Sequence, residues 1–170
     1  MRSLLPLEKL PTQCVATDAS KVLPPVFLRG WLIDESKFRQ DAANRGIVRT
    51  SETYIYPDDW DKHRDPSTIQ HVVYFDAVST FNAYASTVIK KQLGVLLPVC
   101  GYLRYVWGSK VADDVEQNPV AIIALYDNYH IYSKPSKENI ERIRVVFGFE
   151  GEPQWFPEAS ELYWRYASTY

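Results

Sequence analysis

The densest group of potential metal ligands lies between residues 57 and 71. Its members are the side chains of Asp58, Asp59, Asp61, His63, Asp65 and His71. Carboxylates together with imidazoles can bind a divalent metal ion. The Ca²⁺-loop pattern is not met, because its glycine and its closing glutamate are missing. We therefore predict a solvated acidic loop without metal, and a divalent site built from Asp58, Asp61, His63 and His71 is the alternative.

A second candidate surrounds His130, in the segment from Tyr126 to Tyr132. Histidine can act as an acid or a base near neutral pH. Asp127-Asn128 predicts a tight turn between two strands, and if Tyr126, His130 and Tyr132 share a sheet face, they would form a polar aromatic cluster. Such a cluster could transfer a proton or hold a planar ligand. The simpler interpretation, which we favour, is a half-exposed hairpin with aromatic cross-strand pairs.

The sequence shows no nucleophile with an activating partner. Cys100 falls in an apolar run, where a buried and unreactive thiol is the common case. The Gly-x-Ser-x-Gly elbow, the phosphate-binding glycine loop and the dinucleotide fingerprint are all absent from the sequence. We interpret Cys14 and Cys100 as free thiols in a reducing compartment, with a disulfide between them as the alternative. Catalytic residues and a cofactor stay unassigned.

Aromatic residues form the remaining candidate site. Residues 1–26 contain none, although the chain has 12 Tyr, 7 Phe and 5 Trp. Tyr and Trp combine a large apolar ring with a polar group, which suits the wall of a pocket. We therefore expect the protein to bind a small aromatic or apolar molecule, such as a pigment or a metabolite. The predicted lining consists of Trp31, Arg29, Tyr74, Tyr102, Arg104, Tyr126, His130 and Tyr132.

Two other classes of function stay open. The first is a small enzyme whose dispersed site would draw on His130, Tyr132 and Arg104, together with the acidic loop. The second is a homodimeric interaction or structural protein. Its contacts would come from the N-terminal arm or from the aromatic C-terminal segment, both of which could reach across an interface.

Periodicity and turn signals predict strands interleaved with helices. Asp34 and Ser136 are expected N-caps, while Gly46 and Gly148 are expected to end the same two helices. Asp127-Asn128 predicts a tight hairpin, and residues 151–157 a turn-rich linker. The expected strands are 26–33, 52–56, 69–75, 102–107, 120–126 and 129–132, and the expected helices are 35–45, 78–93, 137–147 and 158–167.

This order of elements predicts an α+β fold, with a mixed or antiparallel sheet of about five to six strands covered by three to four helices. Two β-α-β stretches resemble a ferredoxin-like arrangement, although the sequence shows no internal repeat. Residues 1–25 contain four prolines and are expected to form an extended arm on the body or on a partner subunit. Residues 26–170 are expected to form a single domain.

Charge and hydropathy exclude several classes of protein. The net charge is −2, from 19 Lys and Arg against 21 Asp and Glu, which disfavours a nucleic-acid binder. The longest strongly apolar run, residues 95–100, is too short to span a bilayer. Charged residues and prolines interrupt the leucines near the N-terminus, so no secretory signal is expected. The predicted location is the cytoplasm, without membrane association.

Overall fold

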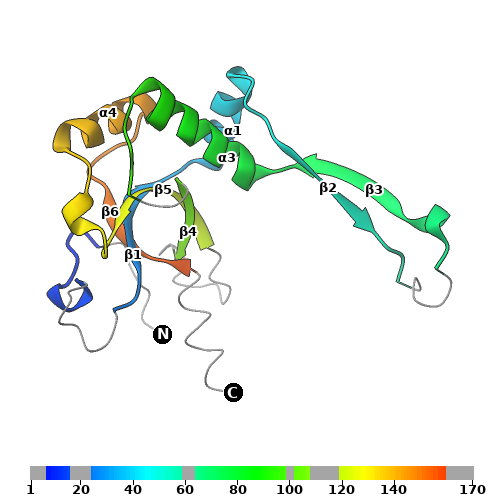
Figure 1. The fold of residues 1–170 in the computed structure, drawn as a ribbon, viewed down its shortest axis with the longest axis horizontal. Helices are drawn as coiled ribbons and strands as arrows, with labels where there is room; N and C mark the ends of the chain where they lie inside the picture. Colours follow the sequence, from blue (N-terminus) through cyan, green and yellow to red (C-terminus); the bar gives the residue numbers. More distant parts are fainter. Residues whose placement is uncertain (1–6, 16–23, 59–63, 99–101, 108–118, 160–170) are drawn as a thin grey trace, which may run out of the picture.

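The computed structural model describes residues 7–15, 24–58, 64–98, 102–107 and 119–159. These residues form an α+β fold, which confirms the predicted class, and their strands pair in antiparallel fashion. Figure 1 shows the arrangement of the elements. The strands are β1 (Phe27–Leu32), β2 (Thr50–Ile55), β3 (Gln70–Phe75), β4 (Leu103–Trp107), β5 (Pro119–Asp127) and β6 (Gln154–Pro157).

Four of these strands form the main sheet, in the order β4-β5-β1-β6. Helices α1 (Glu35–Asn44) and α3 (Ala77–Ser86) lie between β1 and β4 in the chain, and α4 (Lys137–Phe147) lies between β5 and β6. Without β2 and β3, the chain therefore follows the β-α-β-β-α-β order of a ferredoxin-like arrangement. The repeated units differ from the two stretches suggested by the sequence, because β2 and β3 do not join this sheet.

Strands β2 and β3 form a separate two-stranded sheet. Their register pairs Thr50 with Phe75 at the base and Ile55 with Gln70 towards the tip. Both strands were expected from the sequence close to these bounds. The hairpin is inserted between α1 and α3 and projects away from the rest of the fold (Figure 1).

Local signals account well for α1 and α4. Asp34 accepts hydrogen bonds from the backbone N–H groups of Ser36 and Lys37, and it is the predicted N-cap of α1. Ser136 caps α4 in the same way, through the N–H of Asn139. Gly148 has φ +67°, the left-handed conformation that ends a helix at low cost when the residue is glycine.

The helix predicted over residues 78–93 is less regular than its sequence suggests. It is α-helical only to Ser86 and continues as a π-helix over Thr87–Gln92. Val88 and Ile89 in this segment are completely buried. A wider turn of this kind is uncommon and is associated with functional positions in some proteins.

The hairpin predicted at Asp127-Asn128 is wrong. The Asp127 carboxylate accepts the N–H groups of Tyr129 and His130, which turns the chain tightly. Residues Ile131–Ser133 then form a 3₁₀-helix, where a strand was expected. Asn128 is not a solvent-exposed turn residue: it is 1% exposed, and its side chain forms hydrogen bonds with three backbone groups.

The linker predicted over residues 151–157 is also wrong. Residues Gln154–Pro157 form β6, an edge strand of the main sheet that pairs with β1. Pro153 precedes this strand and Pro157 is its last residue, and proline is tolerated at the ends and outer edges of sheets. The helix predicted over residues 158–167 lies almost entirely outside the described residues.

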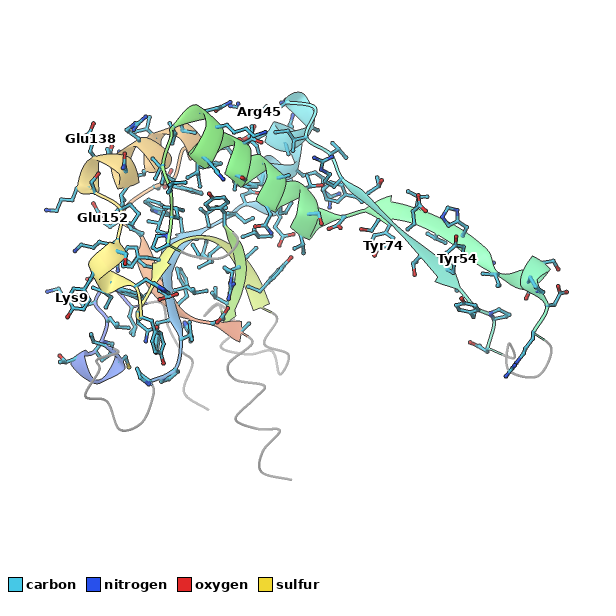
Figure 2. All side chains as sticks on the ribbon, in the orientation of Figure 1. Lys9, Arg45, Tyr54, Tyr74, Glu138 and Glu152 are labelled. Atoms are coloured by element: carbon cyan, nitrogen blue, oxygen red, sulfur yellow. The ribbon has the colours of Figure 1, made fainter. Side chains whose placement is uncertain are left out.

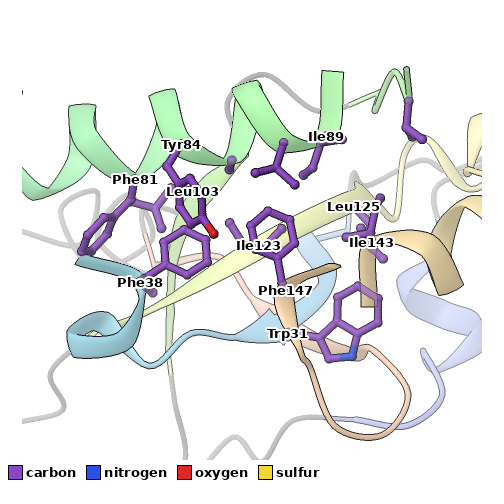
Figure 3. Packing of buried hydrophobic residues seen from close by; sticks show 14 of the residues in the cluster. Trp31, Phe38, Phe81, Tyr84, Ile89, Leu103, Ile123, Leu125, Ile143 and Phe147 are labelled. Carbon is purple, nitrogen blue, oxygen red and sulfur yellow. The ribbon is translucent and has the colours of Figure 1, made fainter. Parts of the chain in front are cut away.

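The main core lies between the sheet and the helices, and it gathers the rings of Phe38, Phe81, Tyr84 and Phe147 with branched aliphatic side chains (Figure 3). A smaller buried cluster lies on the opposite side of the sheet strands: Leu28, Val106, Ile122, Ala124 and Phe156. Both faces of the central strands are therefore buried, which explains the continuous apolar run along β5.

Residues 7–15 of the predicted arm lie against the body of the same chain. Leu7 and Trp155 exchange two backbone hydrogen bonds of 2.8 Å. The Arg29 guanidinium donates to the carbonyl of Glu8 at 2.7 Å. Within the described residues, no helix combines the length and the apolar composition required to cross a membrane.

Candidate functional site

Three of the predicted pocket residues are used in internal packing. Trp31 is 5% exposed and Tyr126 is 9% exposed. Arg29 lies opposite Tyr126 in the sheet, and its guanidinium lies 5.7 Å from the ring centroid of Trp155. Tyr126 meets the same Trp155 ring edge-on at 5.4 Å. Arg29 and Tyr126 therefore pack against Trp155, and the burial of Trp31 and Tyr126 leaves little of their ring surface for a ligand.

Burial shifts the pKa values of Arg29 and Tyr126 in opposite directions. Desolvation lowers the pKa of Arg29, while the nearby Tyr126 and Glu152 act in the opposite direction. Desolvation likewise raises the pKa of the Tyr126 hydroxyl, and the positive charge of Arg29 partly offsets that effect.

Arg104 and His130 do not share a site. Arg104 on β4 forms an ion pair with Glu158, whose side chain is 9% exposed. It lies opposite Ile122, and β5 continues from there to Asp127, a distance of about 17 Å along the strand. His130 lies beyond that point, where its Nδ1 is 2.8 Å from Asp127 Oδ1. The dispersed enzyme site suggested by the sequence is therefore not assembled by these two residues.

The last three predicted pocket residues lie in three separate places. Tyr102, just before β4, is partly buried against the main core, and desolvation raises its pKa. Tyr132 is 91% exposed on the 3₁₀-helix after β5. Tyr74 is 50% exposed on the hairpin. The eight predicted residues therefore do not line one pocket.

Part of the predicted acidic loop can be placed. Asp65 accepts hydrogen bonds from Ser67, both from its N–H and from its hydroxyl, and it caps a short 3₁₀-helix. His71 Nε2 lies 3.1 Å from Glu52 Oε2 across the hairpin. Residues 59–63 lie outside the described residues. Among the residues that the structure does describe, no three His, Cys, Asp or Glu side chains gather as a metal site would require.

Two adjoining depressions flank the loop that follows α4. Their volumes are about 330 Å³ and about 280 Å³, and both are lined by Leu32, Phe149 and Glu150. Phe149 stacks on Trp31 with ring centroids 5.0 Å apart. The indole Nε1 of Trp31 donates to the carbonyl of Gly151 at 3.2 Å. Only Trp31 was singled out from the sequence, because nothing there brings Phe149 next to it.

The β2–β3 hairpin exposes several large apolar side chains to solvent. It carries large apolar side chains with about half of their area in water: Tyr54 58%, Ile55 50%, Val73 54% and Tyr74 50%. Figure 2 shows Tyr54 and Tyr74 on the hairpin, away from the rest of the fold. Clustered exposed apolar groups of this kind mark interaction sites more often than ordinary surface.

Each face of the hairpin carries exposed apolar side chains, and one of them also carries the pair Glu52 and His71. On one face, Tyr54 lies against His71 with ring centroids 5.1 Å apart, and His71 contacts Glu52. The register places Val73 next to Glu52 on this face. The other face carries Ile55 and Tyr74. Both faces therefore present apolar surface with few charges.

The base of the hairpin is firmly attached to the helices. The Asp76 carboxylate accepts the Ser51 hydroxyl at 2.6 Å and the Ser79 N–H at 2.8 Å. The Thr80 hydroxyl accepts the N–H of Arg49 at 2.9 Å. These bonds join the start of β2 to the first turn of α3. They hold the hairpin at a fixed root, although its outer part contacts no other strand among the described residues.

Comparison with known proteins finds no matching family model, no matching curated protein and no matching solved structure.

Proposed function

We propose that the protein acts through protein–protein association and that the β2–β3 hairpin is its contact element. The observation that carries this proposal is the exposure of Tyr54, Ile55, Val73 and Tyr74 on a hairpin that projects from the body. A two-stranded ribbon is marginally stable in water by itself. A partner strand or surface would cover its apolar side chains and complete its sheet.

The energy available from such a contact is substantial. A tyrosine side chain buries about 150–250 Å² when it is fully covered. A half-exposed ring therefore leaves about 100 Å² in water, which is worth about 2.5 kcal/mol at 25 cal/mol per Å². Tyr54 and Tyr74 alone could contribute several kcal/mol to binding. Aromatic residues of this type are frequent among the strongest contributors to interfaces.

Photo-crosslinking in the native host tests the proposal. A photoreactive phenylalanine analogue would replace Tyr74, and in a matched control it would replace Tyr132, which is 91% exposed on another part of the fold. We expect protein adducts of defined mass from position 74 and none from position 132. Equal labelling from both positions, or none from position 74, would remove the hairpin as the contact element.

We propose small-molecule binding as a second candidate, and the two depressions beside Phe149 favour it. Their volumes lie near the lower limit for small-molecule pockets, about 300 Å³. The partly buried Phe149 ring would contact an apolar ligand. Native mass spectra of protein from its own host and from bacteria test this candidate. A host-specific mass that is lost in Phe149→Ala supports it, and identical apo masses oppose it.

We propose the cytoplasm as the place of this association. Cys14 is a free and partly buried cysteine, as expected in a reducing compartment. Alkylation of intact cells, followed by mass spectrometry of the Cys14 peptide, checks this. A reduced thiol in the native host agrees with the proposal, and a disulfide at Cys14 contradicts it.

A further inference from the structure

The hydrogen-bonding direction of each residue in β3 follows from one bond at the base of the hairpin. The N–H of Asp76 donates to the carbonyl of Arg49 at 3.0 Å, in register with the β2–β3 pairs. Hydrogen-bonded and non-hydrogen-bonded pairs alternate along an antiparallel ladder. Val72 and Tyr74 therefore direct their backbone groups at β2. The backbone groups of His71, Val73 and Phe75 point to the opposite edge, which pairs with no other strand in the part of the chain that the structure describes.

The free edge of β3 has none of the usual protection against pairing. Proteins commonly protect exposed edges with charged side chains, proline or a bulge. Residues 70–75 include no Lys, Arg, Asp, Glu or Pro. Their register with β2 is also free of a bulge. An uncharged edge of β-branched and aromatic residues is well suited to receive another strand.

The residues at the free edges of β2 and β3 indicate which edge could pair with a second copy of this chain. The three outward-directed residues of β3 are centred on Val73, so they can pair with themselves about a two-fold axis at that residue. Val73 would then face Val73 of the second copy, and His71 would face Phe75. The free edge of β2 is centred on Glu52. The same symmetric pairing there would place two carboxylates opposite each other, which is unfavourable.

We propose that β3 pairs in antiparallel fashion with β3 of a second copy of this chain, about a two-fold axis at Val73. The two hairpins then form one four-stranded sheet, which places Val72 beside Tyr74 of the other copy. The interface is isologous, as in most homodimers. This inference rests on the proposed association function and names its partner.

The small area of the β3–β3 contact indicates that the dimer forms only at high protein concentration. A standard interface buries about 800 Å² on each partner. A single pair of short edge strands covers less than that area, even with Val73 and Tyr74 included. The dimer is therefore weak and depends on protein concentration.

Sedimentation equilibrium of the full chain, from about 10 µM to about 500 µM, covers the range for a contact of this size. We expect the wild-type protein to change from monomer to dimer across it. Val73→Lys and Val73→Glu should each weaken the dimer at least about tenfold, because like charges then meet at the axis. An equal mixture of the two variants should restore a dimer, because opposite charges then meet.

Val145→Lys is the matched control, since Val145 is 64% exposed on α4. It should dimerise like the wild type, and circular dichroism should show all variants folded. A wild-type monomer at the highest concentration would overturn the inference, as would unchanged dimerisation of Val73→Lys or a mixture that stays monomeric. If the protein is monomeric but Tyr74 still gives crosslinks to another protein, the proposed function stands and the second copy is excluded.

Discussion

The guanidinium of Arg39 lies over the ring of Phe75, with its central carbon 4.2 Å from the ring centroid. Arg39 belongs to α1 and Phe75 ends β3, so this contact joins the body to the base of the hairpin. Phe75 also meets Phe81 of α3 at 6.1 Å. The hairpin is therefore held at its root by α1 and α3, while its outer residues stay exposed.

Replacing Arg39 by Ala should loosen the hairpin with little effect on the body. A cation–π contact contributes about 0.5–2 kcal/mol, and this one acts only at the root. Hydrogen exchange should become faster over residues 70–76 and stay unchanged in β5. Arg45→Ala is the control, since Arg45 lies over Tyr84 of the main core at 5.7 Å. Equal effects of both substitutions on the hairpin would contradict this description of the root.

Asp76 should make the attachment of the hairpin sensitive to acid. Hydrogen bonds from the Ser51 hydroxyl and the Ser79 N–H hold the pKa of Asp76 below its ordinary value. Because the folded pKa is the lower one, this stabilisation is present above the ordinary Asp pKa of about 3.9 and is lost as the pH falls through the folded pKa. Carboxyl NMR titration should show the pKa of Asp76 rising in Ser51→Ala. An unchanged pKa would contradict the assigned bond.

Asn128 should be costly to replace, because it joins three parts of the chain. Its Oδ1 accepts the N–H of Phe27 at 2.9 Å, and its Nδ2 donates to the carbonyls of Cys14 and Pro25. Asn128→Ala leaves these buried groups unpaired and should cost about 2–4 kcal/mol in urea unfolding. Asn139→Ala, at a less buried position on α4, is the control. A loss below about 0.5 kcal/mol for Asn128→Ala would show that water replaces these bonds.

Gly30 should not tolerate a side chain. A Cβ at this position would lie 2.1 Å from the carbonyl oxygen of Ile123, next to the irregular register between β1 and β5. Gly30→Ala should therefore cost about 1–3 kcal/mol or more. Gly46→Ala is the comparison, since its Cβ would meet no atom within 4 Å and only its φ of +68° would be strained. Thermal unfolding of both variants tests the difference, and a smaller loss for Gly30→Ala would contradict the packing.

The helices could be predicted because their signals are local. Asp34, Ser136 and Gly148 act over one helical turn, and each lies where its residue type predicts. The turn after β5 was misassigned because Asp127 and Asn128 suit a hairpin equally well. What decides between the two outcomes is the burial of Asn128 against residues more than 100 positions away. Strand β6 was missed because it is short, with a proline just before it and another as its last residue.

The candidate site was predicted only in part. Tyr74 was singled out as an aromatic residue on a strand, but its position on a projecting hairpin could not be foreseen. The consecutive apolar residues Tyr54-Ile55 in β2 and Val72–Phe75 in β3 look like those of strands that a larger sheet would bury. The sequence contains no signal that these two strands leave the main sheet. It likewise could not show that Trp31 and Tyr126 would be packed inside.

The exposed rings of the hairpin should matter for association and little for folding. Tyr54→Ser with Tyr74→Ser removes two half-exposed rings, and surface substitutions of this kind usually change stability by less than about 0.5 kcal/mol each. Urea unfolding should therefore stay close to that of the wild type, while crosslinking from a photoreactive residue placed at Val73 of the same hairpin is lost. A large loss of stability would instead show that the two rings support the fold.

The most direct measurement is residue-resolved amide exchange along β3 at about 10 µM and about 500 µM protein, a range suited to a weak contact. Val72 and Tyr74, which bond to β2, should be protected at both concentrations. His71 and Val73 should exchange freely in the dilute sample and become protected in the concentrated one. Equal protection of Val73 at both concentrations would contradict the account, because exchange at this edge of β3 should slow only when a second copy pairs with it.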